Sequence, residues 1–247
     1  MIFGQVADWF LDGSHWRGAD GVPTRLLEHL TLSVEAIVIA CLLALPLALV
    51  LGHLGRGGFL AVNVSNIGRA LPSFAILVLA AQLPAIGIGN VAALIALVAL
   101  AVPPLVTNTY VGVRAVDPDI KEAARGMGLS GSQVLRRVEL PLAMPLVLAG
   151  LRTSAVQVIA TATLAAYVSA GGLGRYIVDG FAQADTPKIY AGALLVALLA
   201  LVVELGLGLL QRRLSPVARE GGVPAAVRAG PGTDVTTVEA RPVGSRR

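Results

Sequence analysis

The sequence predicts an all-α membrane protein with about five transmembrane helices. Of its 247 residues, 55% are hydrophobic and only 14% are charged, whereas an ordinary soluble domain carries about 25% charged residues. The mean hydropathy is +0.77. The apolar residues gather in runs about as long as the roughly 20 residues that a helix needs to cross the apolar core of a bilayer. These runs lack the alternation of a strand and are too long for one, so they are not predicted to be strands.

The N-terminal segment, residues 1–28, is predicted to be extracytoplasmic and partly helical. It lacks the basic start and the small-residue cleavage site of a signal peptide. Apolar residues such as Ile2, Val6 and Trp9 recur at helical spacing. This spacing predicts a short amphipathic helix on the membrane surface, with Trp9 and Trp16 at the level of the lipid headgroups. A disordered terminus is the alternative.

A transmembrane domain is predicted over residues 29–213. Its five spans are expected at about Thr31–Leu51, Ile67–Leu83, Val91–Val111, Leu142–Ala170 and Tyr190–Leu210. Pro72, Pro103 and Pro104 fall within the second and third spans. Because proline lacks the N–H that a helix interior needs, we expect these residues to break or kink their spans.

The distribution of basic residues predicts the orientation. Lysine and arginine gather in three places: between the first two spans, between the third and fourth, and after the fifth. They are Arg56, Arg69, Arg114, Lys121, Arg125, Arg136, Arg137, Arg212 and Arg213. Since such residues favour the cytoplasmic side, the N-terminus is expected outside and the C-terminus inside.

The last residues, 214–247, are predicted to be a disordered cytoplasmic tail. They are rich in proline, glycine and charge and have no periodicity, so they cannot bury a core. The arginines of the tail could contact anionic lipid, and an inert tail is the alternative.

A polar stretch between the third and fourth spans has the signals of a capped helix. Asp117 suits the N-cap and Pro118 the first helical position. Ala123 and Ala124 keep one face of the helix small. Such a helix can fit closely into a groove on another protein, although an ordinary connecting helix has the same signals.

The end of this stretch predicts a turn and a second helix. Gly126 and Gly128 are expected to end the first helix. A short helix over about Ser130–Val138 should follow, closed by Pro141 before the fourth span.

The same stretch resembles the EAA loop of ATP-binding-cassette importer permeases. Glu122-Ala123-Ala124 is followed after three residues by Gly128, and after nine more by Val138-Glu139-Leu140-Pro141, where the family has a β-branched residue, any residue, Leu and Pro. The resemblance implies the type I importer permease fold and a cytoplasmic coupling helix that docks into an ATPase subunit. The coupling residues that it implies are Glu122, Ala123, Ala124, Arg125, Gly126, Gly128, Leu140 and Pro141.

In this resemblance Glu122 contacts the ATPase and Gly128 permits the turn after the helix. Ala123 and Ala124 supply the close-packing surface. Arg125 could pair with an acidic rim of the partner, or remain solvated or near lipid phosphate.

A narrower resemblance, over about residues 29–213, is to the osmoprotectant branch of these permeases. It is carried by the segments ALPSFAIL, NTYVGVRAVDPDIKEAARGMG, VELPLAMPLVLAGLRTS and ATATLAAYVSAGGLGRYI. It implies import of glycine betaine, choline, carnitine or proline betaine across the bacterial plasma (inner) membrane. Another small polar solute such as an amino acid is the alternative cargo, and a stand-alone channel or secondary carrier is the alternative class.

The implied partners are cytoplasmic ATP-binding subunits, a second copy or paralogue of the permease, an extracytoplasmic substrate-binding protein and membrane lipid. No nucleic-acid partner is expected. The chain has no Walker motif, so no cofactor is expected on it, and ATP and Mg²⁺ would be used by the partner ATPase.

Polar residues within the predicted spans are candidates for the transport path. Ser154, Gln157 and Thr161 share one helical face, which could line a pore or hydrogen-bond a neighbouring helix. Glu204 lies near the middle of the fifth span, where an ionisable residue is a functional candidate. It could be protonated, pair with Arg69 or Arg152, or face the pore.

Two further patterns predict no chemistry. The single cysteine, Cys41, and the scattered histidines do not form a catalytic or metal-binding set. The glycine-rich Ser169–Gly174 segment lacks the ending of a phosphate-binding loop. Its glycines are expected to let the chain turn sharply.

Overall fold

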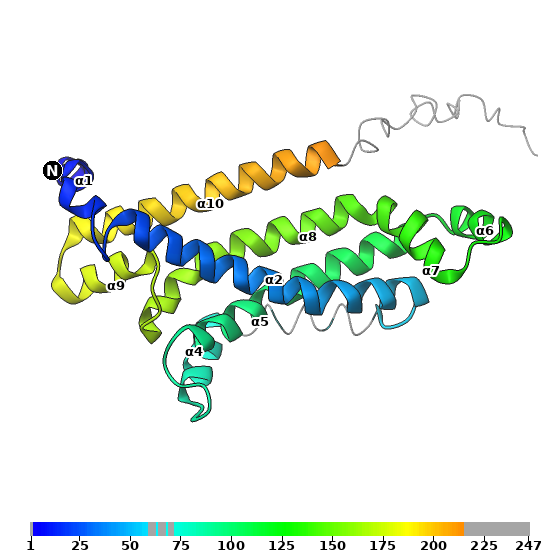
Figure 1. The fold of residues 1–247 in the computed structure, drawn as a ribbon, viewed down its shortest axis with the longest axis horizontal. Coiled ribbons are helices and arrows are strands. Elements are labelled where there is room, and N and C mark those ends of the chain that lie inside the picture. The colour runs from blue at the N-terminus through cyan, green and yellow to red at the C-terminus, as the bar shows by residue number, and fades with distance from the viewer. Residues whose placement is uncertain (1, 59–62, 64–67, 69–71, 215–247) are drawn as a thin grey trace, which may run out of the picture. The chain divides into compact units, whose positions relative to one another are not determined.

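The computed structural model describes residues 2–58, 63, 68 and 72–214, and this part of the chain is helical without strands (Figure 1). The helices are α1 (Ile2–Leu11), η1 (Gly13–Trp16), α2 (Val22–Leu54), α4 (Ser73–Gln82), α5 (Asn90–Arg114), α6 (Pro118–Gly126), α7 (Gly131–Val134), the π-helical turn η2 (Leu135–Glu139), α8 (Leu140–Thr161), the 3-10 helix η3 (Ala162–Val168), α9 (Gly174–Gln183) and α10 (Thr186–Leu214). The predicted tail lies outside the described residues, except for Leu214.

Among the described residues, four helices are long and apolar enough to cross a membrane. They are α2, α5, the continuous helix Gly131–Val168 and α10. Four of the five predicted spans are therefore confirmed. Of the second, the structure describes chiefly the ten-residue α4. Much of Ile67–Leu83 ahead of α4 lies outside the described residues, so a fifth span stays a prediction.

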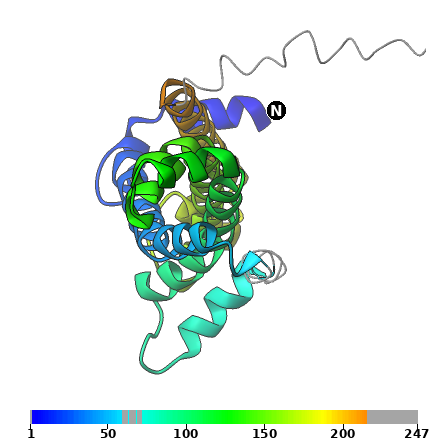
Figure 2. The ribbon, with the colours of Figure 1, turned by 90° about the vertical axis from the view of Figure 1, so that its right-hand side faces the viewer.

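The helices α2, α5 and α8 pack side by side, and α10 lies against α8 and α9 (Figure 1). Figure 2 shows α4 at the edge of this bundle, where it contacts α5. A stripe of alanines at every fourth position of α2 is fully buried and brings the backbones close. The stripe comprises Ala36, Ala40, Ala44 and Ala48. Gly52 continues it, and a Cβ there would lie 2.8 Å from the Cβ of Val113.

The third span is not broken at its prolines, and a kink there stays a prediction. The helix α5 runs unbroken through Pro103 and Pro104, both of which are buried. Neighbouring polar groups bond to carbonyls in this region: Asn108 Nδ2 donates to Pro104 O at 2.8 Å, and Ser154 Oγ of α8 to Ala101 O at 2.9 Å. Pro72 stands at the N-cap of α4.

The N-terminal helix is confirmed, while the predicted level of Trp9 and Trp16 at the headgroups stays a prediction. Trp9 is only 6% exposed. Its ring stacks on His15 with centroids 4.2 Å apart and meets Tyr176 of α9 edge-on at 5.4 Å. The helices α9 and α10 give this ring a protein surface, which the local pattern could not reveal. Trp16 is 44% exposed, and its Nε1 donates to Phe10 O.

Candidate functional site

The helix α6 begins as its sequence predicts. Asp117 is the N-cap, and its Oδ1 accepts a hydrogen bond from the N–H of Asp119 at 2.9 Å. Pro118 occupies the first turn, where a missing N–H costs nothing. These signals fix where α6 starts after α5 ends.

The two alanines of the EAA motif face different surroundings. Ala124 is buried within this chain at 3% exposure, whereas Ala123 is exposed. Ile120 and Met127 are 46% and 75% exposed. Because Ile120, Ala123 and Met127 are three and four residues apart, they share one face of α6. We call this set the exposed face of α6.

The sequence reasoning missed Ile120 and Met127. Their spacing from Ala123 was the available signal, because apolar residues at three- and four-residue intervals form a stripe. An apolar stripe on a helix outside the membrane-spanning segments is suited to contact with another protein.

The charged residues of the motif lie beside a cavity of about 540 Å³ between α6 and the C-terminal end of α2. Glu122 and Arg125 are both exposed there. The walls also hold Arg114 and Lys121, so basic groups outnumber the one carboxylate of Glu122. This surface therefore favours an acidic partner.

The two glycines of the loop have different roles. Gly128 has φ +85°, a conformation that L-residues with a side chain rarely adopt, so it makes the turn. Gly126 is the last residue of α6. The turn is held by backbone bonds from Met127 N to Ala123 O at 3.0 Å and from Leu129 N to Ala124 O at 3.2 Å.

The second helix begins where predicted but does not end at Pro141. Ser130 and Gln133 form a capping box before α7. The helix then continues through the π-helical turn η2 into α8, with Leu140 half-buried and Pro141 exposed. Pro141 is tolerated because it follows the π turn at the first positions of α8, where the hydrogen-bond pattern already changes.

The last residue of η2, Glu139, is completely buried, and sequence reasoning missed it. Its Oε2 lies 2.6 Å from Nδ1 of His53, at the end of α2, and its Oε1 lies 3.5 Å from Nζ of Lys121 on α6. We call these three residues the Glu139 cluster. The motif allows any residue at this position, so only its charge in a largely apolar segment could have drawn attention to it.

The polar face of α8 does not act as one unit. Ser154 is buried and hydrogen-bonds α5, which is the second of its two predicted uses. Gln157 and Thr161 are half-buried. Glu204 of α10 forms an ion pair with Arg152 of α8, which is one of the alternatives predicted for Glu204.

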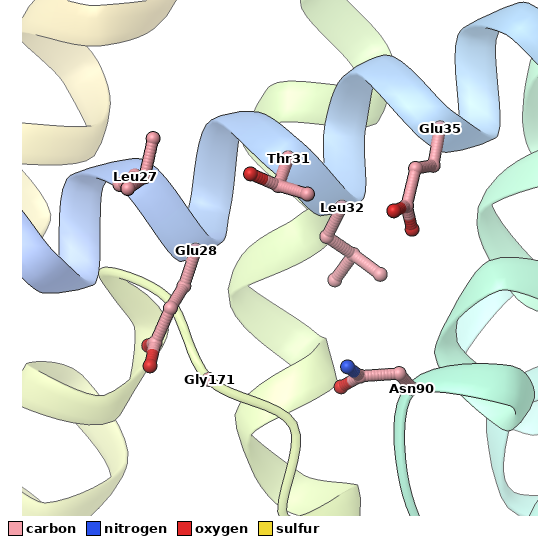
Figure 3. A pocket seen from close by; sticks show the side chains of 7 residues that line it. All are labelled: Leu27, Glu28, Thr31, Leu32, Glu35, Asn90 and Gly171. Atoms are coloured by element: carbon pink, nitrogen blue, oxygen red, sulfur yellow. The ribbon is translucent and has the colours of Figure 1, made fainter.

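A second cavity, of about 290 Å³, lies at the opposite end of α2 from His53. Figure 3 shows Glu28 and Glu35 of α2 pointing into it, with Asn90 of α5 across from them. Within the described residues Glu35 has no hydrogen-bond or ion-pair partner. A charged residue of a spanning helix is expected to face a cavity rather than lipid.

The glycine-rich segment closes one side of this cavity and turns sharply, as predicted. Glu28 Oε2 accepts a hydrogen bond from Gly172 N at 2.8 Å, and Gly172 has φ +95°. A Cβ on Gly171 would lie 2.2 Å from Glu28 Oε2. A side chain at Gly171 would therefore require the Glu28 carboxylate to move.

The described part of the chain contains no group of three or more His, Cys, Asp or Glu side chains that could hold a metal ion.

Comparison with known proteins shows a family match over most of the chain. Residues 36–216 match the family described as binding-protein-dependent transport system inner membrane component. The choline transport system permease protein OpuBB of Bacillus subtilis (strain 168) is 39% identical over 196 residues, 79% of this chain and 89% of that protein. The carnitine transport permease protein OpuCB of Listeria monocytogenes is 41% identical over 199 residues, 79% of this chain and 90% of that protein.

A third relative is the glycine betaine/carnitine/choline transport system permease protein OpuCB of Bacillus subtilis (strain 168). It is 37% identical over 194 residues, 78% of this chain and 88% of that protein.

Solved structures share the fold. The inward-facing MetNI methionine ABC transporter matches with a TM-score of 0.66 at 21% identity, over 76% of this chain and 93% of that one. An amino acid ABC transporter crystallised with histidines matches with a TM-score of 0.61 at 21% identity, over 78% and 93%. The predicted type I importer permease fold is thereby confirmed.

Proposed function

We propose that this chain, which belongs to the family of binding-protein-dependent transport system inner membrane components, is the transmembrane permease subunit of an ATP-driven importer of osmoprotectants. The relatives' names supply the cargo, because they describe permeases for choline, for carnitine, and for glycine betaine, carnitine and choline. Glycine betaine, choline, carnitine and proline betaine all carry a quaternary ammonium group. They form the cargo class that we assign to this chain.

The observation that carries the proposal is the exposed face of α6. This helix is capped at Asp117, ended by the left-handed Gly128, and presents Ile120, Ala123 and Met127 away from the bundle. An apolar helical stripe beside a basic cavity fits a groove with an acidic rim on a partner. In our proposal the partner is a cytoplasmic ATPase subunit, and Glu122 and Arg125 lie at the edge of the contact.

The remaining partners follow from this assignment. A second permease, either another copy of this chain or a paralogue, completes the pore, and an extracytoplasmic binding protein delivers the cargo. The N-terminus lies outside and α6 inside, in accord with the basic residues on and around α6. ATP and Mg²⁺ are used by the ATPase, and this chain supplies no catalytic group.

Transport then depends on movement of α6. When the ATPase pair closes on ATP, the two coupling helices move together and the pore opens toward the binding protein. The change in the permease is a rocking of packed helices between two arrangements. Each arrangement must keep the intramembrane polar groups paired or hydrated.

The test is uptake of labelled glycine betaine, with choline, carnitine and proline betaine as competitors. A strain lacking this chain and any redundant system is complemented with the native chain, Gly128→Trp or Gly126→Ala. We expect uptake with the native chain and Gly126→Ala, and loss with Gly128→Trp, because Gly128, unlike Gly126, has a positive φ. No betaine uptake with the native chain would overturn the cargo.

Purification separates the importer from a stand-alone channel or secondary carrier. We expect an ATPase to copurify with the native chain and to be lost with Glu122→Lys. Uptake of betaine without any ATPase would favour the carrier. Uptake of an amino acid in place of betaine would leave the importer intact and change only its cargo.

A further inference from the structure

The Glu139 cluster lies where α2, α6 and the π turn before α8 meet. The Glu139 carboxylate is 1% exposed, whereas its partners His53 and Lys121 are 17% and 13% exposed. A buried carboxylate is costly unless it is paired. Its position at the junction of three helices therefore calls for an explanation beyond a surface ion pair.

The π turn directs Glu139 into this position. In η2 the N–H of Leu140 bonds to Leu135 O, five residues back, in place of the usual four. Each such turn inserts an extra residue into a helix and re-aims the side chains that follow, and π turns are frequent at functional sites. Pro141 follows directly and has no N–H of its own to donate.

Lys121 extends the cluster to α5. Its Nζ donates a hydrogen bond to Val113 O at 3.0 Å, a carbonyl in the last turn of α5. A lysine near a helix C-terminus satisfies a carbonyl that has no partner within the helix. One side chain of α6 thus hydrogen-bonds the end of α5 and forms an ion pair with Glu139, whose Oε1 has no hydrogen bond among the described residues.

Without the Glu139 cluster, apolar packing would connect α6 only weakly to α2. The helix α6 packs mainly on α7 and η2, and Ala124 is its one buried residue. Between α6 and the end of α2 lies the cavity of about 540 Å³, lined by both His53 and Lys121. The polar link from Lys121 through Glu139 to His53 runs behind this cavity and joins the two helices.

The position along α2 gives the link a mechanical use. With 33 residues, α2 is about 50 Å long, so it reaches past an apolar core of roughly 30 Å. Its buried alanine stripe packs along α5 through the bundle. A displacement of α6 passed to His53 would therefore be carried along the whole of α2.

We propose that Glu139 is a positioning residue that couples α6 to α2, so that displacement of α6 by the ATPase moves the end of α2 with it. This inference rests on the proposed function, and it adds a residue and a route to it. Glu139 touches neither the cargo nor the ATPase in this assignment. It acts through His53 and Lys121.

The first test compares uptake with ATP hydrolysis in the importer complex purified through this chain and reconstituted in vesicles. Glu139→Gln keeps the side chain's shape and removes its charge. We expect the ATPase to remain bound and to hydrolyse ATP, while cargo moved per ATP falls about 2- to 30-fold, the range of coupling changes of 0.5–2 kcal/mol. Asp179→Asn on α9, which breaks the pair with Arg175, is the control and should leave the ratio unchanged.

A purely structural role gives a different result. Uptake, complex yield and ATP hydrolysis would then fall together, with the ratio of cargo to ATP unchanged, and that outcome would overturn the proposal. An unchanged Glu139→Gln variant would overturn it as well. If the native chain binds no ATPase, the proposed function itself fails, which is a distinguishable result.

A double-mutant comparison tests the link to α2. If His53 and Glu139 act as one unit, His53→Gln and Glu139→Gln together should lower the cargo moved per ATP no more than either change alone. Independent effects that multiply would contradict the proposed route. If Glu139→Gln fails to fold, Lys121→Met and His53→Gln take its place, because both side chains are less buried.

Whether the end of α2 keeps its distance from α6 during the ATP cycle can be measured in the assembled complex. Spin labels at Leu54→Cys, on the end of α2, and at Asp119→Cys, on α6, are both at exposed positions, and Cys41→Ser removes the native cysteine. We expect the distance between the labels to be the same with and without ATP, and to shift or broaden in the Glu139→Gln background. A change on ATP binding in the otherwise native chain would show that α2 does not follow α6.

Discussion

Two glycines in one loop should respond in opposite directions to the same substitution. Gly126 ends α6 in helical conformation, whereas Gly128 has φ +85°. A Cβ added at either position would have no atom within 4 Å other than local backbone, so steric crowding does not decide the outcome. Only the backbone preference of alanine does.

The magnitude follows from that preference. Alanine in the left-handed conformation costs about 1–2 kcal/mol, whereas alanine in a helix is favoured over glycine by up to about 1 kcal/mol. Gly128→Ala should therefore shift the local opening equilibrium of the turn about 5- to 30-fold toward the open form. Gly126→Ala should leave the turn unchanged or stabilise it.

Hydrogen exchange measured by mass spectrometry reads this equilibrium directly. The reporters are the amides of Met127, Gly128 and Leu129, which bond to carbonyls within α6. We expect faster exchange of these amides in Gly128→Ala and equal or slower exchange in Gly126→Ala. Equal effects of the two substitutions, or protection by Gly128→Ala, would refute the assignment of the turn to Gly128.

Three further predictions concern stability, measured by unfolding of the purified protein in detergent. Ser154→Ala should cost about 1 kcal/mol, because it removes the buried bond to Ala101 O; unchanged stability would contradict this. Burial raises the pKa of Tyr176 from 10.0 to about 12, so the unfolded chain ionises first and stability should fall between these pH values. Tyr176→Phe should remove that part of the pH dependence. Glu204→Gln should lower the melting temperature, and Arg152→Gln in addition should recover part of the loss, since the pair is then removed whole.

Much of the fold could be predicted because its determinants are local or periodic. Long apolar runs identified four helices of span length. Asp117 and Pro118 placed the start of α6, and Gly128 placed its turn, because caps and left-handed glycines depend only on neighbouring residues. The candidate coupling residues were located by motif spacing. Their contacts with an ATPase stay a prediction.

Other features depend on surroundings that the local pattern does not contain. Trp9 is buried by Tyr176, a residue far away in sequence. Pro103 and Pro104 looked like breaks, but α5 stays continuous within a tightly packed bundle. Pro141 looked like a helix end, but the π turn before it lets the helix continue.

The sequence by itself therefore determined where four membrane helices lie, where α6 begins and that a glycine turn follows it. Only the tertiary structure decided which face of α6 stays exposed, which alternative Ser154 and Glu204 adopt, and that Glu139 is buried. His53 and Glu139 are 86 positions apart, and their side chains meet at 2.6 Å only because α2 and α8 both pack on α5. That packing buries the Glu139 carboxylate, and burial makes a partner for its charge necessary.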